Sequence, residues 1–360
     1  MDDLSCGAVA GLGLMNKHTM VLAGLGLVAG LLLSPARRLL FNRWLVLGGI
    51  VAFVLFLPNV LWQIEHGWPS LEFYRNATLL KNLPSPPLKT LANQVVFMNP
   101  ILFPVWAAGL VFVFTRDGRY RVVGFAYVIL LAILVASQSG RPDRIAGLYP
   151  TLLAAGAVWW EGALAPRAAP LRWVFMGVVV VGCLALAPLF QPLLPPEDAA
   201  RFATFVGIDT QIERGEGKRA ALPQWLADRF GWEELTTQVG EIYDGLSSEE
   251  QRSALIVAPS YGHAGALELL GDLPPVLSAH NTYHTWGREL AGRLAEGPVI
   301  VLGWRRSDVE SLYDDVREAG VYECDYCMNW RNDMAIYVAR QSKLTASEFA
   351  ADWESFKHYE

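Results

Sequence analysis

Long apolar stretches occupy the first half of the chain, and shorter apolar segments alternate with polar ones in the second half. A helix needs about 20 mainly apolar residues to cross a bilayer. Six stretches approach or reach that length, and they cover residues 18–33, 44–62, 90–114, 121–137, 145–163 and 171–190. The pattern predicts an α-helical polytopic membrane domain with about six spans over residues 1–192.

A shorter apolar stretch, Cys6–Met15, precedes the first predicted span. It is too short to cross a bilayer alone. Gly7, Gly11 and Gly13 give it a face of small residues, which in membranes lets two helices approach closely. We therefore expect this stretch to pack against another helix.

Arginines gather in alternate connections between the predicted spans. They are Arg37, Arg38 and Arg43, then Arg116, Arg119 and Arg121, then Arg167 and Arg172. Cytoplasmic loops carry an excess of Lys and Arg, so this face is predicted to be cytoplasmic. The loops 63–89 and 137–144, and everything after Gln191, then lie on the outer face.

Residues 193–360 have the alternation of an α/β domain. Strands are predicted at 254–258, 299–303, 321–324 and 335–339, and helices at 222–246, 262–270, 307–319 and within 345–360. Thr345 or Ser347 is the expected cap of the last helix. The fold class predicted from the sequence is thus a polytopic membrane domain followed by a small soluble α/β domain.

Charge divides the chain at the same place. Of its 360 residues 53% are hydrophobic and 18% charged; residues 1–192 carry a net charge of +7 and residues 193–360 one of −13, which together make −6. The acidic second half has no basic patch interleaved with aromatic residues, so nucleic acid is not an expected partner. The partners expected of the first half are membrane lipids.

Cations on the predicted outer face are the first candidates for chemistry. Lys17 follows the short apolar stretch, and Arg141 and Arg144 flank Asp143 in the loop 137–144. Arginines on the outer face run against the positive-inside bias, and the guanidinium fork suits phosphate oxygens. A phosphate site is one interpretation; a snorkelling Lys17 and a local salt bridge of Asp143 to Arg141 or Arg144 are the others.

Glu65 and His66 open the long outer loop. A carboxylate and an imidazole can tune each other's pKa for general acid/base work. Adjacent helical residues do not face each other, however, so an ordinary solvated loop is the alternative.

Two further groups of residues lie in the second half. Cys324 and Cys327 could join His280 and His284 in a split zinc site, or form a disulfide or remain free thiols. The segment around His280, Asn281 and Tyr283 is both polar and aromatic, which suits sugar recognition or a plain surface loop. The sequence demands neither a metal nor a cofactor, and none is predicted.

Several segments together resemble glycosyltransferase family 39, the dolichyl-phosphate-mannose protein mannosyltransferase and aminoarabinose transferase group, in its bacterial members. The similar segments are 11–18, 57–69, 141–150, 222–225 and 278–283. The resemblance runs over most of the chain, and its motifs are moderately specific.

The resemblance implies a GT-C fold in the plasma (inner) membrane, with the C-terminal domain extracytoplasmic. It implies inverting transfer of a sugar from a polyprenyl-phosphate carrier to a lipid or glycan acceptor outside the cytoplasm. It also implies that basic residues at the outer interface hold the carrier phosphate, a role that falls on Lys17 and, secondarily, on Arg141 and Arg144. Glu65 and His66 fall in a recurrent loop of the family.

One departure from the family concerns the segment before Gly11. The family has further spans and an outer loop with the catalytic carboxylate there, whereas only about ten residues precede it here. The expectation is an N-terminally shortened member. The alternative function is a non-catalytic module that binds lipid-linked sugar or assists assembly; a transporter is less favoured, because the spans carry almost no ionisable residues away from their ends.

Overall fold

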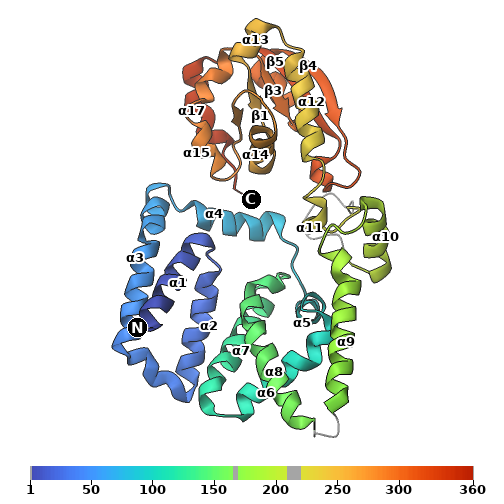
Figure 1. Ribbon diagram of the computed structural model, residues 1–360. Coiled ribbons are helices and arrows are strands. Elements are labelled where there is room, and N and C mark those ends of the chain that lie inside the picture. Colours follow the sequence, from blue (N-terminus) through green and yellow to red (C-terminus); the bar gives the residue numbers. More distant parts are fainter. Residues whose placement is uncertain (1, 165–168, 209–219, 360) are drawn as a thin grey trace. The chain divides into compact units, whose positions relative to one another are not determined.

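The chain forms two compact units in the computed structural model, which describes residues 2–164, 169–208 and 220–359 (Figure 1). Unit 1 comprises residues 1–67 and 83–186, and unit 2 comprises residues 68–82 and 187–360. The sequence placed the boundary at 192/193, six residues later than the division seen here, and assigned 68–82 to the membrane half. Arg167, placed above in a cytoplasmic loop, lies outside the described residues.

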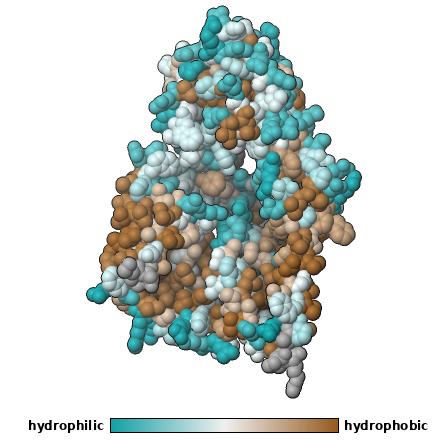
Figure 2. Space-filling model, viewed as in Figure 1, coloured by the Kyte–Doolittle hydropathy of each residue, from teal (hydrophilic) through white to brown (hydrophobic). Residues whose placement is uncertain are grey.

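Unit 1 is helical throughout its described residues. Its α-helices are α1 (Asp2–Asn16), α2 (Met20–Leu33), α3 (Arg43–Glu65), α5 (Pro87–Phe97), α6 (Phe103–Thr115), α7 (Arg121–Ala136), α8 (Tyr149–Ala163) and α9 (Ala169–Leu186). Short 3₁₀ turns join them: η1 (Pro35–Phe41), η3 (Pro100–Leu102), η4 (Gly118–Tyr120) and η5 (Pro142–Leu148). Figure 2 shows apolar residues gathered over these helices, the surface that a lipid-facing helix requires.

By length and composition, three helices of the described chain can cross a membrane: Arg43–Glu65, Gly118–Ala136 and Pro170–Leu189. Two bent helix pairs raise the number to five if each is one span. The described chain thus offers three to five candidate spans, and the number of about six stays a prediction. The stretch 90–114 bends by 92° at Pro100, next to Asn99 with φ of 66°, because proline cannot continue the hydrogen-bond ladder.

Glycines allow three helix pairs of unit 1 to pack with their backbones nearly touching. A Cβ on Gly7 of α1 would lie 2.2 Å from the carbonyl oxygen of Gly48 in α3, and one on Gly156 of α8 would lie 1.8 Å from that of Val105 in α6. Gly30 of α2 meets α7 in the same way. The expectation that the glycine face of Cys6–Met15 packs against another helix is confirmed.

Unit 2 is built on a five-stranded sheet with the order β2-β1-β3-β5-β4. The strands are β1 (Leu255–Val257), β2 (Val276–Leu277), β3 (Val299–Leu302), β4 (Tyr313–Tyr322) and β5 (Met334–Ser342). β2, β1 and β3 are parallel, and β5 is antiparallel to both β3 and β4.

Helices α12 (Trp232–Asp244) and α14 (Tyr261–Leu270) cover one face of this sheet, and α17 (Ala346–Phe356) with the 3₁₀ turn η8 (Ala291–Ala295) covers the other. The remaining helices of unit 2 are α10 (Pro196–Val206), α11 (Gln224–Ala227), α13 (Ser248–Ser253), α15 (Tyr283–Gly287) and α16 (Arg306–Leu312), with the 3₁₀ turns η7 (Ala187–Leu189) and η9 (Asn329–Arg331). The segment 68–82, which also belongs to unit 2, forms α4 (Pro69–Asn76) and a π-helical turn η2 (Ala77–Lys81).

Alternate strand residues face two separate apolar clusters. Ile256 and Ile300 pack with α12 and α14, whereas Val257 and Val301 pack with α17 and η8. The fold class predicted from the sequence, a helical membrane domain followed by a small α/β domain, is confirmed.

Two predicted helices of unit 2 are wrong in part. The helix expected at 307–319 ends at Leu312, and the chain continues as β4, which pairs with β5 over most of its length. The helix expected at 222–246 is broken, because Gly231 takes a φ of 82° between α11 and α12. Thr345 caps α17 with the reciprocal bonds of a capping box to Glu348, as predicted.

Candidate functional site

Two cations far apart in the sequence converge on one carboxylate in unit 1. The Lys17 ammonium lies 3.8 Å from Oδ2 of Asp143, and Nε of Arg141 donates to Oδ1 of the same side chain at 3.1 Å. All three side chains are roughly half exposed. The structure therefore brings together two of the three predicted phosphate-binding residues, and we call Lys17, Arg141 and Asp143 the cation cluster.

Local structure fixes each member of this cluster. Lys17 follows the last turn of α1, where its N–H donates to the carbonyl of Gly13 at 2.8 Å, and Asp143 lies in the first turn of η5. The preceding loop is held from α5, since Asn93 donates to the carbonyl of Gly140 at 3.3 Å. The two cations thus project from anchored backbone.

The cation cluster keeps a net positive charge, which favours binding of an anion. Partial burial raises the pKa of the Asp143 carboxyl, but the hydrogen bond and charge of Arg141 and the charge of Lys17 outweigh it and lower the pKa overall. Asp143 is therefore ionised at neutral pH, and the cluster has a net charge of +1. Arg144 takes no part in these ion pairs and is partly exposed in the same turn.

A buried polar chain follows directly after η5. The Tyr149 hydroxyl donates to Oε1 of Gln94 at 2.8 Å and lies 3.1 Å from the hydroxyl of Tyr127. The ring of Trp106 packs edge-on against Tyr149, and its Nε1 is buried without a hydrogen-bond partner in the described chain. No local pattern in the sequence marks these residues, since each lies singly in an apolar stretch and only the helix packing brings them together.

Glu65 and His66 are not arranged as an acid/base pair. The His66 ring stacks on Trp62 with centroids 4.3 Å apart, and its Nδ1 lies 2.9 Å from the Trp62 carbonyl oxygen. Glu65 is the exposed last residue of α3. This geometry ties His66 to its own helix end.

In unit 2, His280 and Asn281 are engaged by the segment after α17. The His280 ring is buried and stacks on His358 with centroids 4.9 Å apart, and the Asn281 N–H donates to the His358 carbonyl at 2.8 Å. Tyr283 is more open, and its hydroxyl donates to the Glu268 carboxylate. Of the three residues predicted to contact sugar, only Tyr283 presents a partly exposed ring beside a carboxylate.

The split zinc site is wrong, and the disulfide alternative is confirmed. Cys324 and Cys327 form a disulfide, whereas His284 stacks on Trp353 and its Nε2 lies 3.0 Å from the Trp353 carbonyl oxygen. In the described ranges, no group of three His, Cys, Asp or Glu side chains could hold a metal ion.

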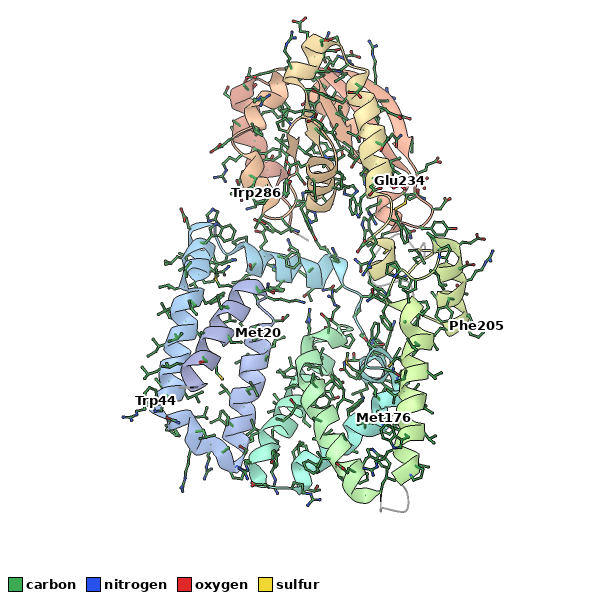
Figure 3. The ribbon with its side chains drawn as sticks, viewed as in Figure 1. Met20, Trp44, Met176, Phe205, Glu234 and Trp286 are labelled. Atoms are coloured by element: carbon green, nitrogen blue, oxygen red, sulfur yellow. A yellow bond between two sulfur atoms is a disulfide. The ribbon has the colours of Figure 1, made fainter. Side chains whose placement is uncertain are left out.

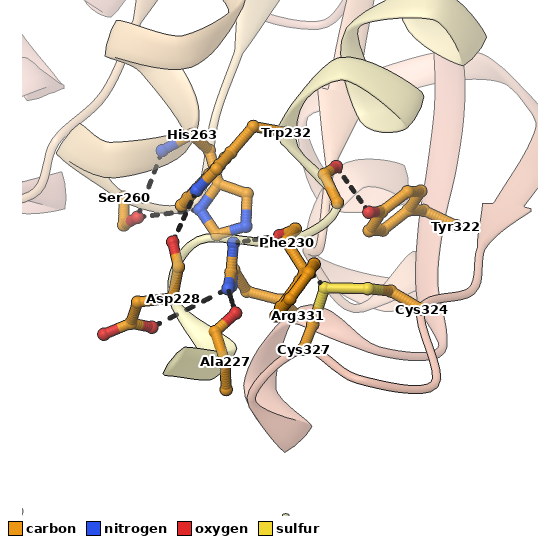
Figure 4. A network of polar contacts seen from close by, with 11 residues as sticks. Ala227, Asp228, Phe230, Trp232, Ser260, His263, Tyr322, Cys324, Cys327 and Arg331 are labelled. Atoms are coloured by element: carbon orange, nitrogen blue, oxygen red, sulfur yellow. Dashed lines mark hydrogen bonds and ion pairs between the residues drawn. A yellow bond between two sulfur atoms is a disulfide. The ribbon is translucent and has the colours of Figure 1, made fainter. Parts of the chain in front are cut away.

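The disulfide lies beside a buried arginine network (Figure 4). Arg331 donates to the carbonyls of Ala227 and Phe230 at 2.6 and 3.2 Å, and its guanidinium lies 4.1 Å from the ring centroid of Trp232. The Trp232 ring also packs edge-on against the His263 ring. Burial is the main cause that lowers the pKa of His263 to about 4. These contacts join α11, α12, α14 and η9, so we interpret the network as structural.

A family model described as dolichyl-phosphate-mannose-protein mannosyltransferase matches residues 3–62. The match includes Lys17 and most of α1–α3. No curated protein and no solved structure matches the chain. The resemblance drawn from the sequence is thus confirmed for the first helices, and it supports a membrane glycosyltransferase that uses a lipid-linked sugar donor.

Proposed function

We propose that this chain transfers a sugar from a polyprenyl-phosphate donor to a lipid or glycan acceptor outside the cytoplasm. The observation that carries the proposal is the cation cluster: Lys17 and Arg141 approach different oxygens of Asp143. Two non-bridging oxygens of a phosphodiester have a similar spacing and charge. A donor phosphate can therefore take the place of the Asp143 carboxylate between the two cations.

The same cations would assist the transfer. The acceptor hydroxyl attacks the anomeric carbon, the bond from that carbon to the phosphate oxygen breaks, and polyprenyl phosphate leaves with one more negative charge. Lys17 and Arg141 would stabilise that developing charge, and Arg144 could add to it from the same turn. The hydroxyl proton must pass to a base, for which Glu65 and His66 remain the candidates.

We place the protein in the plasma (inner) membrane with unit 2 on its outer side. The arginines of the alternate loops support this orientation. The Cys324–Cys327 disulfide in unit 2 also supports it, because disulfides persist in oxidising compartments. Unit 1 is then the membrane domain proposed from the sequence as 1–192 and unit 2 the extracytoplasmic domain proposed as 193–360, except that unit 2 begins at residue 187 and also contains 68–82.

A non-catalytic module that binds lipid-linked sugar is the second candidate. It is favoured by the engagement of His66 with Trp62, which leaves Glu65 and His66 without the mutual contact that acid/base work would use. Such a module would use the same cation cluster without turnover.

The test uses the full chain in nanodiscs. Binding is measured with undecaprenyl phosphate, and transfer with a panel of undecaprenyl-phosphate hexoses and pentoses. The variants Lys17→Ala and Arg141→Ala should each weaken binding, and Arg119→Ala is the matched control because Arg119 forms a similar i, i−2 ion pair with Asp117. Binding with transfer supports the enzyme, binding without transfer supports the module, and no binding refutes both.

A further inference from the structure

Two aromatic rings stand at the surface of unit 2 on α15. Trp286 is 74% exposed, far more than is usual for tryptophan, and Figure 3 labels it at the edge of the unit. Its ring lies 5.0 Å from that of Tyr283 at an angle of 60°. The pair offers an open, tilted aromatic surface.

The helix beneath these rings is firmly held. Trp353 of α17 donates from Nε1 to the His284 carbonyl at 2.9 Å, while Nε2 of His284 lies 3.0 Å from the Trp353 carbonyl oxygen. The two rings are also stacked, and Gly287 packs against the same indole, where a Cβ would lie 2.8 Å from it. The exposure of Trp286 is thus built into a rigid element, as a binding surface requires.

A carboxylate borders the aromatic surface. Glu268 of α14 accepts the Tyr283 hydroxyl through one oxygen, and its side chain is otherwise exposed. A carboxylate oxygen can accept further hydrogen bonds from hydroxyl groups. An anionic lipid surface is disfavoured here, because residues 193–360 have a net charge of −13 and Glu268 would lose its hydration beside lipid.

We propose that Trp286, Tyr283 and Glu268 form a binding site for a neutral saccharide. The aromatic faces pack against the apolar face of a pyranose ring, and Glu268 accepts hydrogen bonds from its hydroxyl groups. The assignment of this saccharide as part of the acceptor rests on the proposed function, whereas saccharide binding itself does not. No residue of the cation cluster contributes to this site.

The experiment measures binding of mannotriose and maltotriose to the full chain in nanodiscs by calorimetry. Trp286→Ala should weaken binding about tenfold or more, and Glu268→Gln should weaken it less. Trp330→Ala is the matched control, since Trp330 is an exposed tryptophan of the same unit, in η9. It should bind as the wild type does.

Other occupants of the surface are tested in parallel. Trp286 emission, taken as the difference between the wild type and Trp286→Phe, should be unaffected by brominated lipids in the nanodisc. Quenching by these lipids, absence of saccharide binding, or equal loss in Trp286→Ala and Trp330→Ala would each overturn the proposal. Saccharide binding by the wild type with no binding of undecaprenyl phosphate would refute the proposed function alone, because the cation cluster is not part of the saccharide site.

Discussion

Replacing Asp143 by asparagine should increase the affinity of the protein for a phosphate-bearing lipid. In the free protein the Asp143 carboxylate forms ion pairs with both Lys17 and Arg141. A ligand phosphate must therefore displace the carboxylate to bind the same two cations. Asparagine keeps the size and one oxygen of the side chain but removes the charge. In the variant, Lys17 and Arg141 would no longer be paired with a carboxylate and could bind the ligand phosphate without displacing one.

The size of the gain follows from the exposure of the pairs. The side chains are 61%, 57% and 46% exposed for Lys17, Arg141 and Asp143. An exposed ion pair contributes about 0.2–1 kcal/mol, so releasing two of them should stabilise the complex by about 0.4–2 kcal/mol, or about 2- to 30-fold in Kd. The gain should shrink with added salt, since exposed charges are screened.

The assay is binding of undecaprenyl phosphate to the wild type and to Asp143→Asn in nanodiscs between pH 4 and 8. The pKa of Asp143 is lowered, so the difference between the two proteins should persist from neutral pH down to about pH 4 and close only below it. Asp117→Asn is the control, because it removes the matching pair with Arg119. Equal or weaker binding by Asp143→Asn would refute the displacement argument and indicate that Asp143 positions the cations instead.

The remaining predictions concern unit 2, and each is measured as the free energy of opening from hydrogen exchange of β3 amides in the full chain. Arg331→Met should lower it by about 3 kcal/mol, because two backbone carbonyls lose their charged donor. Gly231→Ala should lower it by at least about 1 kcal/mol, since φ is 82° and a Cβ would lie 2.2 Å from the Tyr322 hydroxyl; unchanged protection would contradict the strain argument. The pKa of His263 is about 4 in the folded state, so the unfolded state binds more protons below about pH 6.5. The free energy of opening should therefore fall by up to about 1.4 kcal/mol per pH unit between pH 6.5 and pH 4. His263→Asn should make this pH dependence less steep.

Local pattern alone identified much of this molecule. Apolar stretches predicted the helices of unit 1, and glycine spacing predicted the packing face of α1. Short apolar runs predicted β1, β3 and β5, and the start of α17 was predicted from Thr345 or Ser347 as its cap, of which Thr345 is the one observed. These features depend on hydrophobic periodicity and on groups within a few residues, which the sequence displays directly.

The tertiary structure decided what depends on partners distant along the chain. Residues 313–319 became strand because β5 supplies a backbone partner, and His280 and His284 stack on His358 and Trp353, which lie far along the chain. The cation cluster joins Lys17 to a carboxylate 126 positions later, and no local pattern encodes that approach. The packing of whole helices determines which side chains lie together in a site, so the composition of the cation cluster depends on the tertiary structure.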